Sequence, residues 1–369
     1  MRRLLGHNVI LSNAFACLML TKFGLLIFYD WTTGSDYFGQ YALAHGLIAG
    51  LVTLAGFQGR MLVLSKIRNG GDIQRLQVIM ILAALLSATV CLALNWTLGA
   101  LLMLALVCTQ RGLENLLLAR SSFIQVSGQK ETAFIQLNRF GILAFCAYAV
   151  GLYLSLEVAI LAEIAALLLA LFWQRSKMTT RDDGPTLSYV ALGAIGLSYS
   201  LSAGLNAGLN SLLLYFSQTW FSVSDAMLLA QILALQAIIA RLLASNSVFF
   251  LRDIAMLLER YEYSLALIWA ALASVLLSLI SLEASIIFLG NAFTALNAIN
   301  IVLRQHIMAT SGAKSLVWLH ALEMLGFVIL AALFATDIVG IFALFALIRT
   351  IRIPVLLYLR RPDLRTVPL

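Results

Sequence analysis

Charged residues are scarce in this chain. Asp, Glu, Lys and Arg make up 11% of its 369 residues, whereas a soluble domain is about a quarter charged. Hydrophobic residues make up 62%, and the mean hydropathy is +0.96. So few charges cannot cover so large an apolar core in water. The composition therefore excludes an ordinary soluble protein and indicates a membrane protein.

Proline, cysteine and catalytic motifs are also scarce or missing. Four prolines and 24 glycines exclude collagen-like and disordered chains. Cys17, Cys91, Cys108 and Cys146 lie in apolar runs at wide spacing, so we expect small buried side chains and neither a disulfide framework nor a metal site. The chain has no Walker loop, GxSxG, HExxH or CxxC, and its connections are too short for a nucleotide-binding or glycosyltransferase domain. We therefore expect a protein that is not an enzyme and that uses no cofactor or metal.

Long apolar runs dominate the chain. About twelve of them reach the length of about 20 residues that a helix needs to cross a bilayer. This pattern predicts an all-α polytopic membrane protein with about 12 transmembrane helices. The predicted spans are roughly 9–29, 39–65, 76–94, 97–118, 134–153, 155–173, 189–216, 225–250, 264–281, 284–303, 315–335 and 338–358.

Among the connections between these spans, only alternate ones carry Lys and Arg. Cytoplasmic loops of membrane proteins are enriched in Lys and Arg, so both termini are predicted to be cytoplasmic. The net charge of +7 follows from this bias, and we expect no nucleic-acid partner. The basic residues of the cytoplasmic connections and termini include Arg2, Arg3, Lys66, Arg68, Arg75, Arg120, Lys130, Arg175, Lys177, Arg181, Arg252, Arg260, Arg304, Lys314, Arg360, Arg361 and Arg365.

The chain contains an internal repeat. RSSFIQVSGQK begins at Arg120 and RQHIMATSGAK begins at Arg304, 184 residues later, which is half the chain. Both stretches are predicted to lie in the connection after the fourth span of a half. The repeat predicts two six-helix bundles in tandem, residues 1–180 and 181–369, related by an axis along the membrane normal. Such architectures hold substrate in the cleft between the halves.

Lys22 stands inside the first span, in LMLTKFGLLIF, with no acidic neighbour in the sequence. Every other Lys and Arg is expected at or near the cytoplasmic side. Ionisable groups inside the membrane are costly and are functional candidates by default. Two interpretations stay open: the side chain snorkels to the outer surface, or it faces a water-filled cavity beside a stripe of small and polar residues.

Polar residues in the other spans are further candidates. In the seventh span, a polar stripe at i+4 spacing and a small-xxx-small pair of glycines favour either helix packing or binding of sugar hydroxyls. Arg139 and Glu323 occupy equivalent repeat positions with opposite sign, so they are candidates for a pair across the halves or for a gate. Glu163 is a candidate proton-linked carboxylate or a protonated structural residue. The remaining members of these sets are Ser198, Ser202, Asn206 and Asn210 in the stripe, Gly204 and Gly208 in the glycine pair, Arg111 and Glu114 as a local pair, and His45 and His320 as minor candidates for proton coupling.

Three stretches resemble a known family. SDYFGQYALAHG (35–46), LAGFQGRMLVLSKI (54–67) and TWFSVSDAMLLAQ (219–231) are similar to the polysaccharide-transporter, or Wzx-type, branch of the multidrug/oligosaccharidyl-lipid/polysaccharide flippases. The twelve spans and the 6+6 repeat look similar too.

The resemblance implies a flippase of the bacterial inner membrane. It would move an undecaprenyl-pyrophosphate-linked oligosaccharide, a repeat unit of O-antigen lipopolysaccharide or another surface polysaccharide, from the cytoplasmic to the periplasmic leaflet by alternating access. The basic central cavity of the family carries over to Lys22, Arg60 and Arg241, and Asn206 and Asn210 are candidates for the sugar. Further expected partners are membrane lipid, H+ or Na+ as coupling ion, and polysaccharide polymerase machinery.

Two other functions compete with the flippase. An ion-coupled multidrug antiporter on the same fold should present acidic groups to the cleft, whereas the deep candidates here are mainly cationic. A membrane-embedded glycan polymerase or ligase usually carries a large periplasmic loop with Arg or His, which this chain lacks.

Overall fold

A computed structural model describes much of the chain, and no strand occurs among the described residues. The described residues are 21–56, 59, 62–63, 67, 70–98, 103–126, 130–175, 187–235, 300, 303–304, 307 and 314–360. The helices are 21–33, α2 (Tyr37–Leu47), α3 (Ala49–Ala55), α5 (Gly70–Leu98), α6 (Met103–Val126), α7 (Lys130–Leu152), α8 (Leu156–Arg175), α9 (Tyr189–Trp220), Val223–Leu235, α13 (Lys314–Phe334) and α14 (Ile338–Arg360).

Several helices are long and apolar enough to cross a membrane, as the sequence predicts. Within the described residues there are five, namely α5, α8, α9, α13 and α14, and the bent pair α2–α3 could form a sixth span. Helix α6 is not among them and carries Arg111, Glu114 and Arg120. The predicted spans at 225–250, 264–281 and 284–303 fall mostly outside the described residues.

The second predicted span is not one straight helix. Helices α2 and α3 meet at Ile48 with a bend of 55°. Gly46 and Gly50 flank this position, and glycine weakens a helix interior. Gly50 lies against the backbone of α9, since an ideal Cβ on it would stand 2.9 Å from Gly208 Cα. The close approach confirms helix packing through the small residues of α9.

The connection before α2 is held by Asp30. Its carboxylate accepts hydrogen bonds from the Tyr37 and Phe38 N–H groups at 2.8 Å each and from Ser35 Oγ at 2.7 Å. These bonds satisfy donors that the first turn of a helix leaves open. Asp36 makes no capping bond of its own, and burial together with the Asp30 charge raises the pKa of Asp36.

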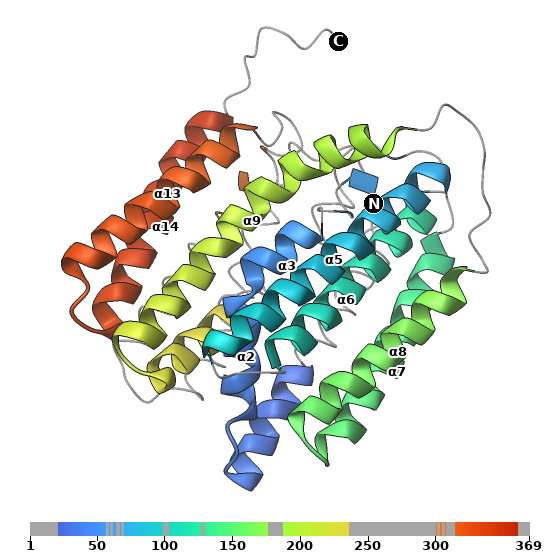
Figure 1. The fold of residues 1–369 in the computed structure, drawn as a ribbon, viewed down its shortest axis with the longest axis horizontal. Coiled ribbons are helices and arrows are strands. Elements are labelled where there is room, and N and C mark those ends of the chain that lie inside the picture. The colour runs from blue at the N-terminus through green and yellow to red at the C-terminus, as the bar shows by residue number, and fades with distance from the viewer. Residues whose placement is uncertain are drawn as a thin grey trace, which may run out of the picture. The chain divides into compact units, whose positions relative to one another are not determined.

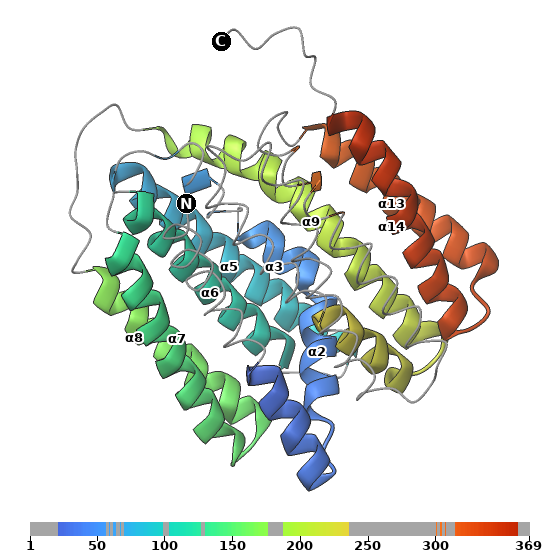
Figure 2. The same ribbon diagram turned by 180° about the vertical axis from the view of Figure 1, so that it is seen from behind.

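The chain divides into two compact units, residues 14–208 and residues 1–13 with 209–369. In the first unit α7 and α8 form a hairpin and α5 lies beside α6 (Figure 1). Hydrophobic side chains from residues 62–67, from α5 to α8 and from the start of α9 form the core of this unit. In the second unit α13 and α14 lie side by side (Figure 2). The predicted halves 1–180 and 181–369 stay a prediction.

Three polar side chains connect segments of the first unit. Asp72 Oδ1 accepts the Leu187 N–H at 2.7 Å, and Arg75 donates to the Leu187 carbonyl. Arg120 donates to the Leu171 carbonyl and, at 3.1 Å, to Gln77 Oε1. The prediction that Arg120 lies in a loop is wrong, because α6 continues to Val126 and buries this side chain between α5 and α8.

Large apolar side chains cover the outside of the helices. Trp31, Leu82, Phe172 and Trp318 are exposed, and Cys146 on α7 is exposed too. Exposed apolar surface on this scale is typical of a protein surrounded by lipid. The expectation that every cysteine is buried is therefore wrong for Cys146, because an apolar side chain of a membrane protein is stable on the lipid-facing surface as well.

Candidate functional site

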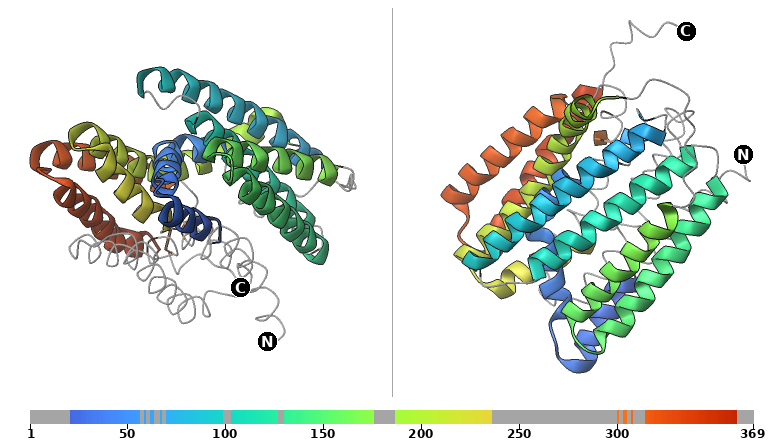
Figure 3. Two further views of the ribbon diagram at one scale, coloured as in Figure 1. Left: turned by 90° about the horizontal axis from the view of Figure 1, so that it is seen from below. Right: turned by 45° about the vertical axis from the view of Figure 1, so that its right-hand side comes forward.

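Lys22 is fixed in the interior of the first unit by its helix. The adjacent Phe23 ring contacts Phe38 and Tyr41 of α2, with ring centroids 5.4 and 6.2 Å apart. Figure 3 shows the helix 21–33 beside α2. The Lys22 side chain is 3% exposed. It therefore does not snorkel to the outer surface.

The Lys22 ammonium group is paired with a carboxylate on another helix. Its Nζ lies 2.5 Å from Glu163 Oε2 of α8 and donates to Tyr41 Oη at 3.2 Å. The ring of Tyr41 lies 4.7 Å from Nζ, and the ring of Tyr148 on α7 lies 4.2 Å from it. A carboxylate and two aromatic faces thus replace the water that the cation lost on burial.

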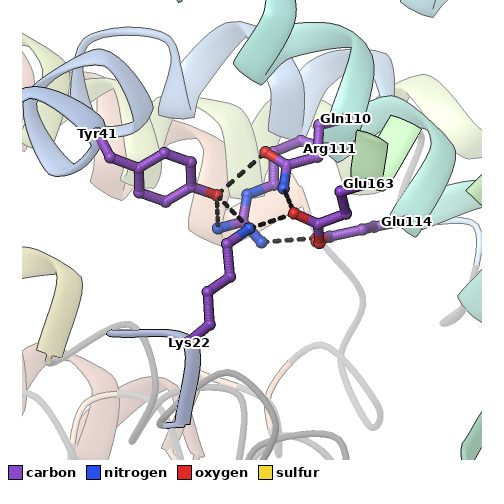
Figure 4. Close-up of polar contacts among 6 residues, drawn as sticks. All are labelled: Lys22, Tyr41, Gln110, Arg111, Glu114 and Glu163. Carbon is purple, nitrogen blue, oxygen red and sulfur yellow. Dashed lines mark hydrogen bonds and ion pairs between the residues drawn. The ribbon is translucent and has the colours of Figure 1, made fainter. Parts of the chain in front are cut away.

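Helix α6 extends this contact into a network (Figure 4). Gln110 donates to Glu163 Oε2 and accepts the Tyr41 hydroxyl at 3.0 Å. Arg111 donates to Tyr41 Oη at 3.2 Å and to Glu114 Oε2 at 2.6 Å. The expected local pair of Arg111 with Glu114 is confirmed. Tyr41 therefore links the Lys22–Glu163 pair to the Arg111–Glu114 pair.

The charges of this network balance. Two bases, Lys22 and Arg111, face two acids, Glu114 and Glu163, and all four side chains are buried. A buried ion pair contributes little net stability, but removing one partner strands a charge at a cost of about 3–5 kcal/mol. Two polar atoms of the network, Arg111 Nε and Tyr148 Oη, have no hydrogen-bond partner among the described residues.

A second buried cluster lies in the other unit. Arg352 of α14 donates to Glu323 Oε2 of α13 at 3.1 Å. His320 Nδ1 lies 3.1 Å from the same oxygen and 3.4 Å from Arg352 Nη1. Arg349, one turn before Arg352, donates to Asn210 Oδ1 of α9 at 3.0 Å. Side chains from α9, α13 and α14 therefore meet in one polar centre.

Two more of the described residues belong to this second cluster. Asn300 Nδ2 donates to the Arg349 carbonyl at 2.9 Å. Arg304 lies within electrostatic range of Arg352 and Glu323. Arg304 Nε, His320 Nε2 and Asn300 Oδ1 have no hydrogen-bond partner within the described part of the chain.

The predicted site residues are distributed unevenly over these clusters. Lys22 and Glu163 are brought together, and Asn210 holds Arg349. Asn206 is half-buried on α9. Arg60 and Arg241 lie outside the described residues.

The predicted pair of Arg139 with Glu323, or a gate formed by them, stays a prediction. Arg139 is exposed on α7. Glu323 contacts Arg352 and His320 of its own unit.

Several members of the two clusters were not among the site residues predicted from the sequence. Tyr41 and Tyr148 look like ordinary aromatic core residues, and Gln110 gave a signal only as part of the polar run TQRGLEN. Arg349 and Arg352 gave a clear signal, since two arginines at i, i+3 stand inside the last predicted span. The expectation that Lys22 is the only base away from the cytoplasmic side is wrong, because Arg349 lies midway along α14 and is 2% exposed.

Neither cluster has the composition of a metal site. Among the described residues no group of three or more His, Cys, Asp or Glu side chains could hold a metal ion. The acids of both clusters instead face Lys, Arg and His side chains.

Comparison with known proteins identifies the fold. No family model and no curated protein sequence matches the chain. The eukaryotic MATE transporter AtDTX14 is 14% identical over 98% of this chain and 96% of its own, with a TM-score of 0.62. A mutant of the Vibrio cholerae MATE transporter VcmN is 15% identical over 97% of this chain and 98% of its own, with a TM-score of 0.56. A multidrug resistance MATE family transporter of the MOP superfamily, in its outward-facing conformation, is 12% identical over 97% and 96%, with a TM-score of 0.51.

These similarities extend over nearly the whole chain. The protein thus shares the all-α fold of these solved structures. At such low identity the similarity concerns the fold, and a shared fold does not carry a shared substrate.

Proposed function

We propose that this protein is a flippase that moves a lipid-linked oligosaccharide with a pyrophosphate headgroup across a bacterial inner membrane. The transporter fold supports membrane passage by alternating access between two halves. The resemblance of the three sequence stretches to Wzx-type flippases supports the substrate class.

One structural observation carries the preference for an anionic substrate. Each buried glutamate of the described residues lies against a buried base: Glu114 against Arg111, Glu163 against Lys22, and Glu323 against Arg352. Within that part of the chain, every buried glutamate is thus already neutralised, which leaves none of them to attract a cationic drug. A pyrophosphate group needs the opposite arrangement, because cations must offset the hydration that it loses inside the membrane.

Lys22 acts in this proposal through its network. The ammonium group is shared between Glu163 and Tyr41, so a headgroup that competes for it would change the pairing of Glu163. Glu163 is then also our candidate for coupling to H+ or Na+, because its carboxylate needs a cation whenever Lys22 turns to the substrate.

A liposome assay tests the function. The purified chain is reconstituted with a fluorescent, NBD-labelled polyprenyl-pyrophosphate-linked sugar, and dithionite is added outside. If the protein moves the lipid, dithionite quenches the inner-leaflet share as well, and an imposed H+ or Na+ gradient changes the rate. The same liposomes are tested for transport of ethidium.

The two readouts separate the candidate functions. Quenching of the inner-leaflet lipid without ethidium transport supports the flippase. Ethidium transport with an unmoved lipid overturns it in favour of the multidrug antiporter suggested by the names of the similar structures.

A further inference from the structure

The second buried cluster has a charge pattern that the Lys22 network does not share. We define the arginine cluster as Arg304, Arg349, Arg352, His320 and Glu323. We infer that the arginine cluster is a binding site for a phosphate-bearing anion in the C-terminal unit. The inference rests on the proposed function for the source of this anion, which is the pyrophosphate headgroup of the lipid.

The first argument is charge. Among the described residues, the arginine cluster contains three guanidinium groups and one carboxylate, whereas the Lys22 network contains two bases and two acids. Arg349 is 2% exposed and Arg352 is 3% exposed. Buried positive charge in excess is costly unless an anion lies next to it. A phosphate group bound within the cluster would supply that anion.

The second argument is an open donor. Arg304 Nε is buried and has no hydrogen-bond partner among the described residues. Buried polar groups are nearly always satisfied, and an oxyanion would satisfy this donor. His320 does not add a second one, because its Nδ1 lies 3.1 Å from the Glu323 carboxylate, which can only accept, so the ring proton lies on Nδ1.

The third argument is that two of the arginines are held in place. Arg349 donates to Asn210 Oδ1, and its own carbonyl accepts from Asn300 Nδ2. Arg352 donates to Glu323 Oε2, and the same oxygen is contacted by His320 Nδ1. A guanidinium group presents a planar fork of donors that matches phosphate oxygens. Holding such groups in position before binding lowers the entropic cost of binding.

The position of the cluster suits a headgroup inside the membrane. At 1.5 Å per residue, Arg349 lies about 16 Å from the first residue of α14. Arg349 and Arg352 are spaced i, i+3 and share one helix face. The cluster therefore lies inside the transmembrane part of α14, where a pyrophosphate has no bulk water to solvate it.

Binding measurements on the purified full-length chain in a neutral detergent test the site. The probes are inorganic pyrophosphate and farnesyl pyrophosphate, and uncharged farnesol is the control. Calorimetric titration should show binding of farnesyl pyrophosphate and none of farnesol. Arg349→Gln should weaken the binding roughly tenfold, which is about 1.4 kcal/mol, and Arg349→Lys, the matched variant that keeps the charge, should retain most of it.

Glu323→Gln tests whether the charge of the cluster determines binding. The variant removes the negative charge of the cluster, so it should bind pyrophosphate more tightly than the wild type. A variant that merely loosened the fold would instead bind pyrophosphate more weakly. Thermal unfolding without ligand monitors folding of each variant. Should Arg349→Gln fail to fold, Glu323→Gln and Arg349→Lys still decide the matter.

The outcomes are distinct. The inference is overturned if Arg349→Gln binds farnesyl pyrophosphate like the wild type, or if Glu323→Gln weakens binding as an arginine loss does. If inorganic pyrophosphate binds as tightly as farnesyl pyrophosphate, the anion site is supported, but the lipid is not the source of the anion. If the probes bind but the liposome assay shows no lipid movement, the site is supported and the flippase function is wrong. If lipid moves but pyrophosphate does not bind, the flippase function is supported and the proposed site is wrong.

Discussion

Removal of one partner of the Lys22–Glu163 pair should harm the protein more than removal of both. The two residues are 3% and 6% exposed, and Nζ lies 2.5 Å from Oε2. Lys22→Met leaves the Glu163 carboxylate buried, with the neutral Gln110 as its donor among the described residues. Breaking a buried pair in this way costs about 3–5 kcal/mol.

The double variant Lys22→Met with Glu163→Gln removes the charge on both sides. The new glutamine side chain can still bond Gln110, and the new methionine occupies the space between the rings of Tyr41 and Tyr148. Replacing a buried ion pair by uncharged groups of similar volume is often neutral or stabilising by about 1–4 kcal/mol. The double variant should therefore unfold near the wild-type temperature, whereas each single variant unfolds well below it.

Thermal unfolding in detergent and the liposome assay together measure the role of the pair. We expect a double variant that is folded and no longer moves the labelled lipid, because the ammonium group is gone. A double variant as unstable as the summed single variants would refute the energetic reasoning. One that is stable and moves lipid at the wild-type rate would reduce Lys22 and Glu163 to a structural pair.

Three further predictions concern stability, each measured by thermal unfolding of the purified chain. Gly50→Ala should cost about 1–3 kcal/mol, because its Cβ would stand 2.9 Å from Gly208 Cα. Gly193→Ala in α9, which has open space around it, should be neutral or stabilising by up to about 1 kcal/mol; equal losses for both would contradict the close helix contact. Asp30→Ala should cost about 0.5–2 kcal/mol, since three donors lose their acceptor, and an unchanged unfolding temperature would contradict this role. The raised pKa of Asp36 means that the folded state holds this proton more tightly than the unfolded state, so its effect favours folding as the pH falls through that pKa. Asp36→Asn should therefore be neutral to stabilising at pH 7, with the gain vanishing in acid; a gain that persists in acid would contradict it.

Much of the fold was predictable because helix position is a local property. The apolar runs at 155–173, 315–335 and 338–358 coincide within a few residues with α8, α13 and α14, since hydropathy over about 20 residues decides whether a helix can cross a bilayer. The bend at Ile48 was not predicted, and neither was the contact of the nearby Gly50 with a helix far away in the sequence.

The candidate site was predictable in its members and not in its pairings. Lys22 and Glu163 were each recognisable as ionisable residues inside apolar spans. Arg349 and Arg352 carried the same signal in the last span and were counted with the cytoplasmic bases instead. Tyr41 and Tyr148 were not recognisable, because an aromatic residue in a span is ordinary until a cation is found beside its ring.

The sequence by itself predicted a membrane protein, the approximate positions of its helices and the charged residues within them. These properties follow from the hydropathy of neighbouring residues, which can be summed along the chain. Only the tertiary structure decided that Lys22 meets Glu163, 141 residues away, and that Arg349 and Arg352 gather around Glu323 and His320. The cost of a buried charge depends on what lies within a few ångströms of it, and in a helical bundle those neighbours come from helices that are distant in the chain.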